Sequence, residues 1–239
     1  MARSNLFYRA LTALILIPII LILIFYSSES VLFFLLAVVI VLCNYELFNL
    51  LKIRKLQDQI FGFSLNLIAL YLIVYKENLF LNFLVILLLI IIFYSLFVIG
   101  IKDFLSYASY YLFSVIYITY LLSFIYKLFV LPNGRHWLLF LLFTNWATDT
   151  CAYFIGIKLG RHKFSKISPN KSIEGLLGGI FGGILVALCF NYFSFKINEW
   201  FLFVLLGASG SIVGQLSDLI ESGIKRSVGV KDSGNMIPG

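Results

Sequence analysis

Long apolar stretches, separated by short polar segments, run along the whole chain of 239 residues. A helix that crosses a bilayer needs about 20 mainly apolar residues. On this basis we predict eight membrane-spanning helices, at Leu11–Tyr26, Val31–Leu51, Ile60–Tyr75, Leu79–Ile101, Tyr107–Val130, Trp137–Ile157, Ser172–Phe190 and Phe201–Ser217. The segments between them are too short for a soluble domain. The pattern therefore predicts an all-α fold, a polytopic helix bundle integral to the membrane.

Composition supports this class and excludes a soluble fold, since 62% of the residues are hydrophobic, 12% are charged and the mean hydropathy is +1.02. The first apolar run lacks a small-residue cleavage site, so we expect a retained helix and not a removed signal peptide. The chain changes character near Trp137. We interpret residues 1–136 as N-terminal membrane helices and residues 137–239 as a catalytic membrane region of the same integral domain.

The distribution of Lys and Arg predicts the orientation. With a cytoplasmic N-terminus, the cytoplasmic segments hold 14 of the 18 cationic residues, which is a strong bias by the positive-inside rule. The net charge of +7 then lies mainly on one surface, where anionic lipid headgroups and nucleotides are both candidate partners. We expect a multi-pass protein of the bacterial inner (cytoplasmic) membrane, with no nucleic-acid partner.

A polar stripe near the C-terminus predicts the position of the chemistry. Asp218, Glu221, Ser222 and Lys225 are spaced i, i+3, i+4 and i+7, which places them on one face of a helix. Ionisable groups at a membrane boundary are costly and usually belong to a site or a pathway. Carboxylates one turn from the Lys225–Arg226 pair suit a divalent cation and phosphate oxygens held side by side.

A second polar region combines the sixth predicted helix with the basic loop that follows it. Asp149 lies inside an apolar run, where it is either a buried hydrogen-bonding anchor or a direct part of the site. The loop contains Lys158, Arg161, Lys163, Lys166 and Lys171. It is either a solvated basic loop or a triphosphate clamp, in which Lys171 and Ser172 offer a cation and helix N-terminal amides together.

Other patterns narrow the function. Glycines at spacings of three and four in the seventh and eighth predicted helices indicate close helix packing more than a nucleotide-binding loop. The three cysteines lie in apolar runs, which favours packing over a disulfide or a zinc site. The chain has no GxxxxGK[ST], GxSxG or HExxH motif, which argues against P-loop, serine-hydrolase and zinc-protease chemistry.

Two segments of this sequence resemble the characteristic segments of phosphatidate cytidylyltransferases. The pattern S-x-x-K-R-x-x-x-x-K-D is met by Ser222, Lys225, Arg226, Lys231 and Asp232. The pattern I-S-P-x-K-[ST]-x-E-G is met by residues 167–175. The resemblance covers the chain from about Trp146 to its end, and the earlier helices match only as generic membrane helices.

The resemblance implies a membrane enzyme that transfers a cytidylyl group from CTP to phosphatidic acid, giving CDP-diacylglycerol and pyrophosphate, with Mg²⁺ as cofactor. It further implies a homodimer among membrane lipids, with its site on the cytoplasmic side. Carried over by position, Asp218 is a metal ligand, and Glu221 and Asp232 support the metal–phosphate site. The groups implied to contact the phosphates are Lys171, Ser172, Lys225 and Arg226. We also predict that substrate is bound by Asp149, Lys163, Glu174, Ser222 and Lys231.

The sequence departs from the family pattern at Pro238-Gly239, where the family continues with H-G-G-x-x-D-R and a last membrane helix. Either the chain is truncated and lacks one metal-binding aspartate of the family, or a carboxylate such as Asp232 takes its place. We favour truncation and expect it to impair the activity of this chain. The alternative function is an ion-coupled transporter or lipid flippase that uses Asp149 and Asp218. Against this alternative, the chain has no internal repeat, and its cationic tail is larger than ion coupling requires.

Overall fold

The computed structural model describes residues 2–165, 167–169 and 171–230, with the side chains of residues 2–11, 13 and 81 left out. Within this part of the chain the structure is helical, apart from short connections and one isolated β-bridge between Lys163 and Ser172. The predicted all-α class is confirmed. The predictions made for Lys166, Lys231 and Asp232 concern positions outside the described residues.

Seven helical segments of the described chain are long and apolar enough to cross a membrane. They are Glu29–Leu50, Leu56–Tyr75, Asn82–Ile99, Phe104–Val130, Gly134–Leu159, Ile173–Phe195 and Trp200–Ser227. Each corresponds to one of the predicted spans, so a polytopic membrane bundle is confirmed. The remaining prediction falls in α1 (Ala2–Tyr26), where the apolar helix found is the shorter segment Leu14–Tyr26.

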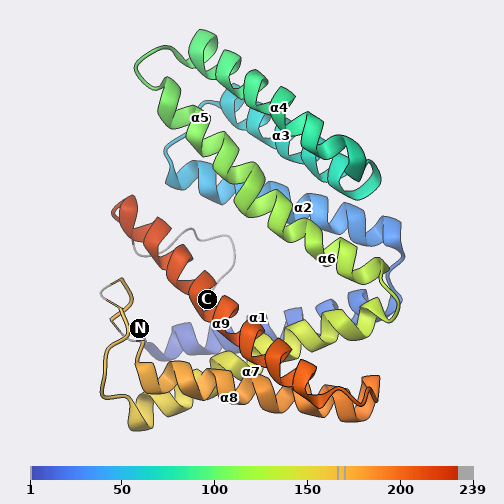
Figure 1. Cartoon of the computed structure of the whole chain (residues 1–239). Helices are drawn as coiled ribbons and strands as arrows, with labels where there is room; N and C mark the ends of the chain where they lie inside the picture. The colour runs from blue at the N-terminus through green and yellow to red at the C-terminus, as the bar shows by residue number, and fades with distance from the viewer. Residues whose placement is uncertain (1, 166, 170, 231–239) are drawn as a thin grey trace. The chain divides into compact units, whose positions relative to one another are not determined.

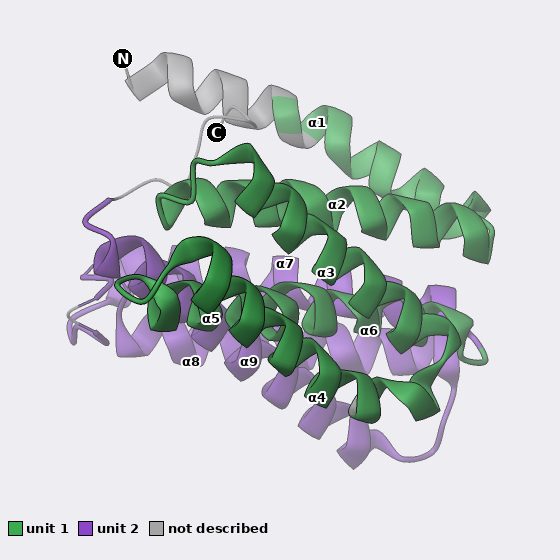
Figure 2. Ribbon diagram, turned by 90° about the horizontal axis from the view of Figure 1, so that it is seen from above, with its two compact units in different colours: residues 1–132, 233–239 green, residues 133–232 purple. Residues whose placement is uncertain are grey.

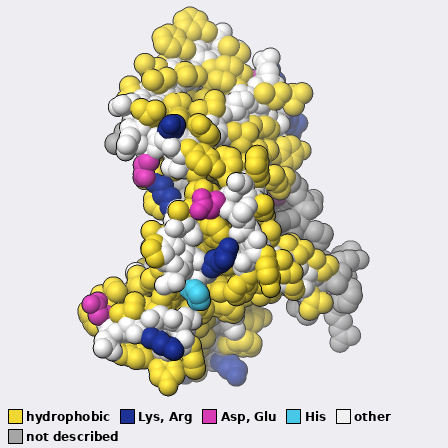
Figure 3. All heavy atoms as spheres, turned by 90° about the vertical axis from the view of Figure 1, so that its right-hand side faces the viewer, with side chains coloured by type: hydrophobic (Ala, Val, Ile, Leu, Met, Phe, Trp, Pro, Cys, Tyr) yellow, Lys and Arg dark blue, Asp and Glu magenta, His cyan; other side chains and the backbone are white. Residues whose placement is uncertain are grey.

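The chain divides near Pro132 into two compact units, which Figure 2 shows in green and purple. Unit 1 contains the helices of the first half, and unit 2 contains α7, α8 and α9. Hydrophobic side chains cover most of the face shown in Figure 3, with few charged groups among them. Large apolar side chains such as Phe34 and Phe97 are 69% and 75% exposed, as expected for surfaces that contact lipid.

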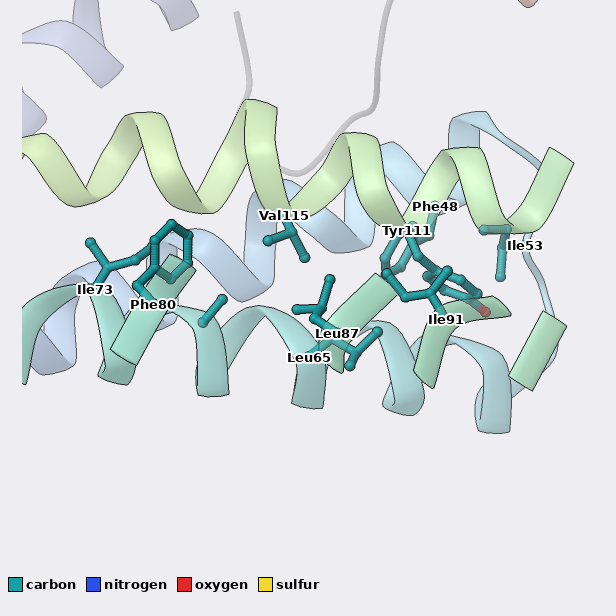
Figure 4. Packing of buried hydrophobic residues seen from close by; sticks show 10 residues of the cluster. Phe48, Ile53, Leu65, Ile73, Phe80, Leu87, Ile91, Tyr111 and Val115 are labelled. Carbon is teal, nitrogen blue, oxygen red and sulfur yellow. The ribbon is translucent and has the colours of Figure 1, made fainter. Parts of the chain in front are cut away.

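Unit 1 is built from α1, α2 (Glu29–Leu50), α3 (Leu56–Tyr75), α4 (Glu77–Tyr94), α5 (Phe104–Phe113) and α6 (Leu121–Val130), as labelled in Figure 1. A π-helical segment, Ser95–Ile99, extends α4, and another, Ser114–Tyr120, joins α5 to α6 without a break. Figure 4 shows the main apolar core of this unit, which includes Phe48, Ile53, Leu65, Ile73, Phe80, Leu87, Ile91, Tyr111 and Val115.

Buried polar side chains cross the interior of unit 1, and most of them are paired. The Tyr94 hydroxyl donates to Asp58 Oδ1 at 2.7 Å, and the Tyr111 hydroxyl donates to the Asp58 carbonyl at 3.1 Å. Deeper along α3, Asn66 Nδ2 donates to Ser114 Oγ at 3.0 Å, and Thr119 Oγ1 donates to Asn66 Oδ1 at 2.5 Å. Because an unpaired polar group is costly in an apolar interior, these bonds fix α3 against the helices around it.

Unit 2 is a bundle of three helices: α7 (Gly134–Leu159), α8 (Ile173–Phe190), which continues as the π-helical segment Asn191–Phe195, and α9 (Trp200–Ser227). In Figure 1, α8 lies alongside α7, and α8 also packs against α9. Glycines of α8 face α7, and other glycines of α8 and α9 face each other. A Cβ placed on Gly182 would lie 2.6 Å from Cys151 Sγ of α7, and one on Gly207 would lie 2.8 Å from the Gly183 carbonyl of α8. The prediction of close glycine packing is confirmed.

Candidate active site

A cavity of about 770 Å³ lies within unit 2, where α7 ends and α8 begins, beside Gln215 and Asp218 of α9. Its polar lining is Asp149, Lys163, Ser168, Lys171, Ser172, Gln215 and Asp218. Asp149 comes from α7, Ser172 caps α8, and Gln215 and Asp218 come from α9. Segments far apart in the sequence thus bring carboxylates, ammonium groups and a hydroxyl to one hollow.

An ion pair between Lys171 and Asp218 joins the basic loop to α9. Lys171 Nζ lies 2.9 Å from Asp218 Oδ2 and 3.5 Å from the Gln215 carbonyl oxygen. The side chains are 30% and 51% exposed, so the pair is open to solvent and to small solutes in the cavity. The two polar regions singled out from the sequence therefore meet here, through one direct contact.

Asp149 lies on the cavity wall and is exposed there. Asp218 and Lys171 line the same cavity. The buried anchor of this stretch is its neighbour Thr148, which is 1% exposed and whose hydroxyl lies 2.7 Å from Ser211 Oγ of α9. Of the two roles considered for Asp149, its position favours a direct part in the site.

The basic loop is held in shape by its own backbone. Phe164 N donates to the Lys171 carbonyl at 2.9 Å, Ile173 N donates to the His162 carbonyl at 2.9 Å, and Lys171 N donates to the Ser168 carbonyl at 3.1 Å. Ser172 begins α8 as its N-cap, with Oγ accepting from Gly175 N at 3.1 Å. The loop therefore presents Lys163 and Lys171 from a folded turn and not from a free solvated segment.

Glu174, in the first turn of α8, closes the same loop from outside the cavity. Its carboxylate accepts from Arg161 N at 3.1 Å and from His162 N at 3.3 Å, and it lies 2.6 Å from His162 Nδ1. Glu174 is not among the residues that line the cavity. Its position indicates that it shapes the loop, and the substrate contact predicted for it stays a prediction.

The C-terminal polar stripe lies on one helix, as predicted, but only part of it reaches the cavity. Glu221 pairs with Lys225 of the next turn at 2.9 Å, and Arg226 Nη1 donates to the Val230 carbonyl at 3.4 Å. The cavity lining ends with Asp218 on this helix and includes none of Glu221, Ser222, Lys225 or Arg226. The structure thus groups Asp149, Lys163, Lys171, Ser172 and Asp218, and it separates them from the last turns of α9.

The oxygen atoms at the Lys171–Asp218 contact suit a divalent cation. Within the described residues, no group of three or more His, Cys, Asp and Glu side chains is placed to hold a metal. Mg²⁺ needs few protein ligands, because it retains water and binds substrate phosphates. Asp218 already holds one cation, the Lys171 ammonium, and Asp149 adds a second carboxylate to the same cavity. The donor set therefore fits Mg²⁺ held by Asp218 and Asp149.

The apolar part of the cavity was not assigned to the site from the sequence. Tyr153, Ile157, Phe164 and Leu176 line it, and the first two are 64% and 66% exposed. Tyr153 follows Asp149 by four residues, and this spacing alone places both residues on the same helix face. No sequence signal indicated that His162 pairs with Glu174.

The family model and the similar proteins all point to cytidylyltransferases. The model of a family described as "Cytidylyltransferase family" matches residues 7–239. Phosphatidate cytidylyltransferase of Staphylococcus aureus (strain COL) is 44% identical over 136 residues, which is 55% of this chain and 50% of that protein. The proteins of the same name from Staphylococcus haemolyticus and Staphylococcus epidermidis are 42% and 44% identical over 134 residues, with the same shares covered. The chain spans about half the length of the curated relatives it matches.

Proposed function

Because the chain belongs to the Cytidylyltransferase family, we propose that it transfers the cytidylyl group of CTP to phosphatidic acid, giving CDP-diacylglycerol and pyrophosphate. The relatives' name, phosphatidate cytidylyltransferase, supports this substrate pair. The observation that carries the proposal is the cavity of unit 2, which holds the Lys171–Asp218 pair beside Asp149. These residues are the parts that a reaction between two anionic phosphates requires.

The chemistry needs charge cancellation and positioning more than a protein nucleophile. A phosphate oxygen of phosphatidate attacks the α-phosphorus of CTP, a new P–O bond forms, and the bond from the α-phosphorus to pyrophosphate breaks. Lys163, Lys171 and the Ser172 hydroxyl lie where they can bind phosphate oxygens and align them. Asp218 and Asp149 would hold Mg²⁺, which would supply Lewis-acid stabilisation of the phosphate charge when bound.

The mixed lining of the cavity suits a lipid substrate. Polar groups lie at the loop and at Asp218, while Tyr153, Ile157 and Leu176 form an apolar wall. A phosphatidate headgroup in this cavity could keep its acyl chains against that wall and in the surrounding lipid. An amphiphilic substrate therefore matches this lining better than a purely water-soluble one.

We further propose that the site faces the cytoplasm, where CTP is available. The basic residues Lys158, Arg161 and Lys163 lie at the cavity end of unit 2, and such residues favour the cytoplasmic side. The homodimer rests on the family resemblance alone. Ion-coupled transport by Asp149 and Asp218 remains the competing function. The family match and the pairing of Asp218 with Lys171 favour nucleotidyl transfer.

Labelled CTP tests the proposal. The purified protein is reconstituted with phosphatidate and Mg²⁺. We expect labelled CDP-diacylglycerol that disappears when Mg²⁺ is chelated. Absence of labelled lipid, with the protein shown to be folded and membrane-inserted, would refute the proposed function.

A further inference from the structure

Lys171 occupies the position at Asp218 that a metal ion would need. Its ammonium lies within 2.9 Å of Asp218 Oδ2 and 3.5 Å of the Gln215 carbonyl, and Asp149 lines the same cavity. These are oxygen atoms of the kind that bind hard cations. The lining holds two carboxylates and two ammonium groups, but among the described residues only Lys171 is paired directly with one of these carboxylates.

The Lys171 side chain can leave this position without disturbing the loop. Its backbone is fixed by the bonds from Phe164 N to the Lys171 carbonyl and from Lys171 N to the Ser168 carbonyl. The ammonium, in contrast, is at the end of a flexible four-carbon stem and lies in an open cavity. Exchange therefore requires rotamer changes only, and the freed ammonium stays within reach of the cavity that Lys163 and Ser172 also line.

We propose that the Lys171 ammonium is a tethered cation that competes with the divalent metal for Asp218, so that metal entry releases Lys171 to bind substrate phosphate. An ammonium and a divalent ion at one carboxylate oxygen would repel each other strongly, so occupancy is exclusive. By linkage, metal binding and phosphate binding then favour each other. A metal at Asp218 frees the Lys171 ammonium for phosphate, and a phosphate at Lys171 frees the Asp218 carboxylate for the metal. This inference rests on the proposed function for the identity of the phosphate, but the exchange itself concerns only the chain and the metal.

Manganese binding tests the exchange without substrate or turnover. Mn²⁺ titrations are followed by electron paramagnetic resonance on the purified chain in phosphatidylcholine nanodiscs, which lack anionic headgroups. Lys171→Met should tighten Mn²⁺ binding about two- to fivefold, the gain expected when a partly exposed ion pair no longer competes. Lys171→Arg keeps the charge and should stay near wild type, whereas Asp218→Asn should lose most of the binding.

Lys163→Met is the matched control for general electrostatics. Lys163 lines the same cavity, but within the described chain it forms no salt bridge with Asp149 or Asp218. Its loss should tighten Mn²⁺ binding less than the loss of Lys171. Thermal unfolding and gel filtration confirm that each variant is folded.

Equal tightening by Lys171→Met and Lys163→Met, or none by Lys171→Met, would overturn the exchange. Unchanged Mn²⁺ binding in Asp218→Asn would also overturn it, because the cation position would then lie elsewhere. Failure of the proposed function looks different: no labelled lipid forms, while Lys171→Met still binds Mn²⁺ more tightly.

Discussion

The Thr148 hydroxyl on α7 lies 2.7 Å from the Ser211 hydroxyl on α9, and both residues are buried beside the glycine face of α8. Thr148 Oγ1 also lies 2.8 Å from the Thr144 carbonyl oxygen, and Ser211 Oγ lies 2.8 Å from the Gly207 carbonyl oxygen. Because each hydroxyl has one hydrogen, one of the two donates to its carbonyl while the other donates across the helices. The pair joins the two helices that contribute Asp149 and Asp218 to the cavity. It therefore links the stability of unit 2 to the geometry of its site.

Thr148→Val should destabilise the protein, because it removes the hydroxyl while keeping the shape of the side chain. The expected cost is about 0.5–1.5 kcal/mol, measured as a lower midpoint of unfolding in detergent. Thr144→Val is the matched control one turn earlier, since the Thr144 hydroxyl is buried with no hydrogen-bond partner among the described residues. Equal destabilisation by both variants would show that the Thr148–Ser211 bond contributes nothing specific.

The glycine contact between α8 and α9 predicts opposite effects for two substitutions in α9. Gly207→Ala should destabilise unit 2, because the new Cβ would lie 2.8 Å from backbone atoms of Gly183 and Ile184. Gly223→Ala meets nothing within 4 Å and should be neutral or slightly stabilising, since alanine favours helix. Thermal unfolding of the two variants checks this. A stable Gly207→Ala protein would contradict the close approach of these helices.

Glu174 should act through the loop and not on substrate. Replacement by Ala removes all the bonds to Arg161 N, His162 N and His162 Nδ1, whereas His162→Ala removes only the last. We expect the apparent KM for CTP to rise more in Glu174→Ala than in His162→Ala, with Glu174→Gln between them. The loop should also become more sensitive to protease in the same order. A fall in kcat with unchanged KM and unchanged proteolysis would instead indicate that Glu174 contacts the reacting groups.

Lys171→Ala should weaken the use of CTP more than the use of phosphatidate, because we place Lys171 at the triphosphate. The loss of one charge-assisted phosphate contact should cost about 1.5–3 kcal/mol in kcat/KM for CTP. Steady-state kinetics with each substrate varied in turn measure the two effects separately. A rise in the KM for phosphatidate alone would show that the two phosphate positions are reversed.

The helices were predictable because lipid contact demands long apolar runs, whatever they pack against. The shared helix face of Asp218 and Lys225 was also predictable from their spacing. The structure continues α9 to Ser227, with cations in its last turn. The start of α3 was predicted late, at Ile60 instead of Leu56. Asp58 and Gln59 appear too polar for a span, but both are buried and bonded, Asp58 to Tyr94 and Gln59 to the Ile53 carbonyl.

The contents of the site were predictable only in part. Helix periodicity placed Asp149 and Asp218 correctly on their helices, but their meeting with Lys171 depends on how the loop folds between α7 and α8. The same loop conformation turns Glu174 toward Arg161 and His162, and no spacing rule contains that information. The roles of Lys231 and Asp232 stay predictions, because these residues lie outside the described part of the chain.

If a cytidylyl group is transferred to lipid in the cavity at Asp218, the position of the isotope in CTP decides which product carries the label. In the reconstituted assay, CTP labelled at the α-phosphate should yield labelled lipid, and CTP labelled at the γ-phosphate should yield labelled pyrophosphate and unlabelled lipid. Asp218→Asn should abolish both signals while the protein stays folded, because the neutral amide keeps the shape but not the charge that Mg²⁺ requires. Lipid labelled from the γ-phosphate, or near-normal transfer by Asp218→Asn, would contradict the account.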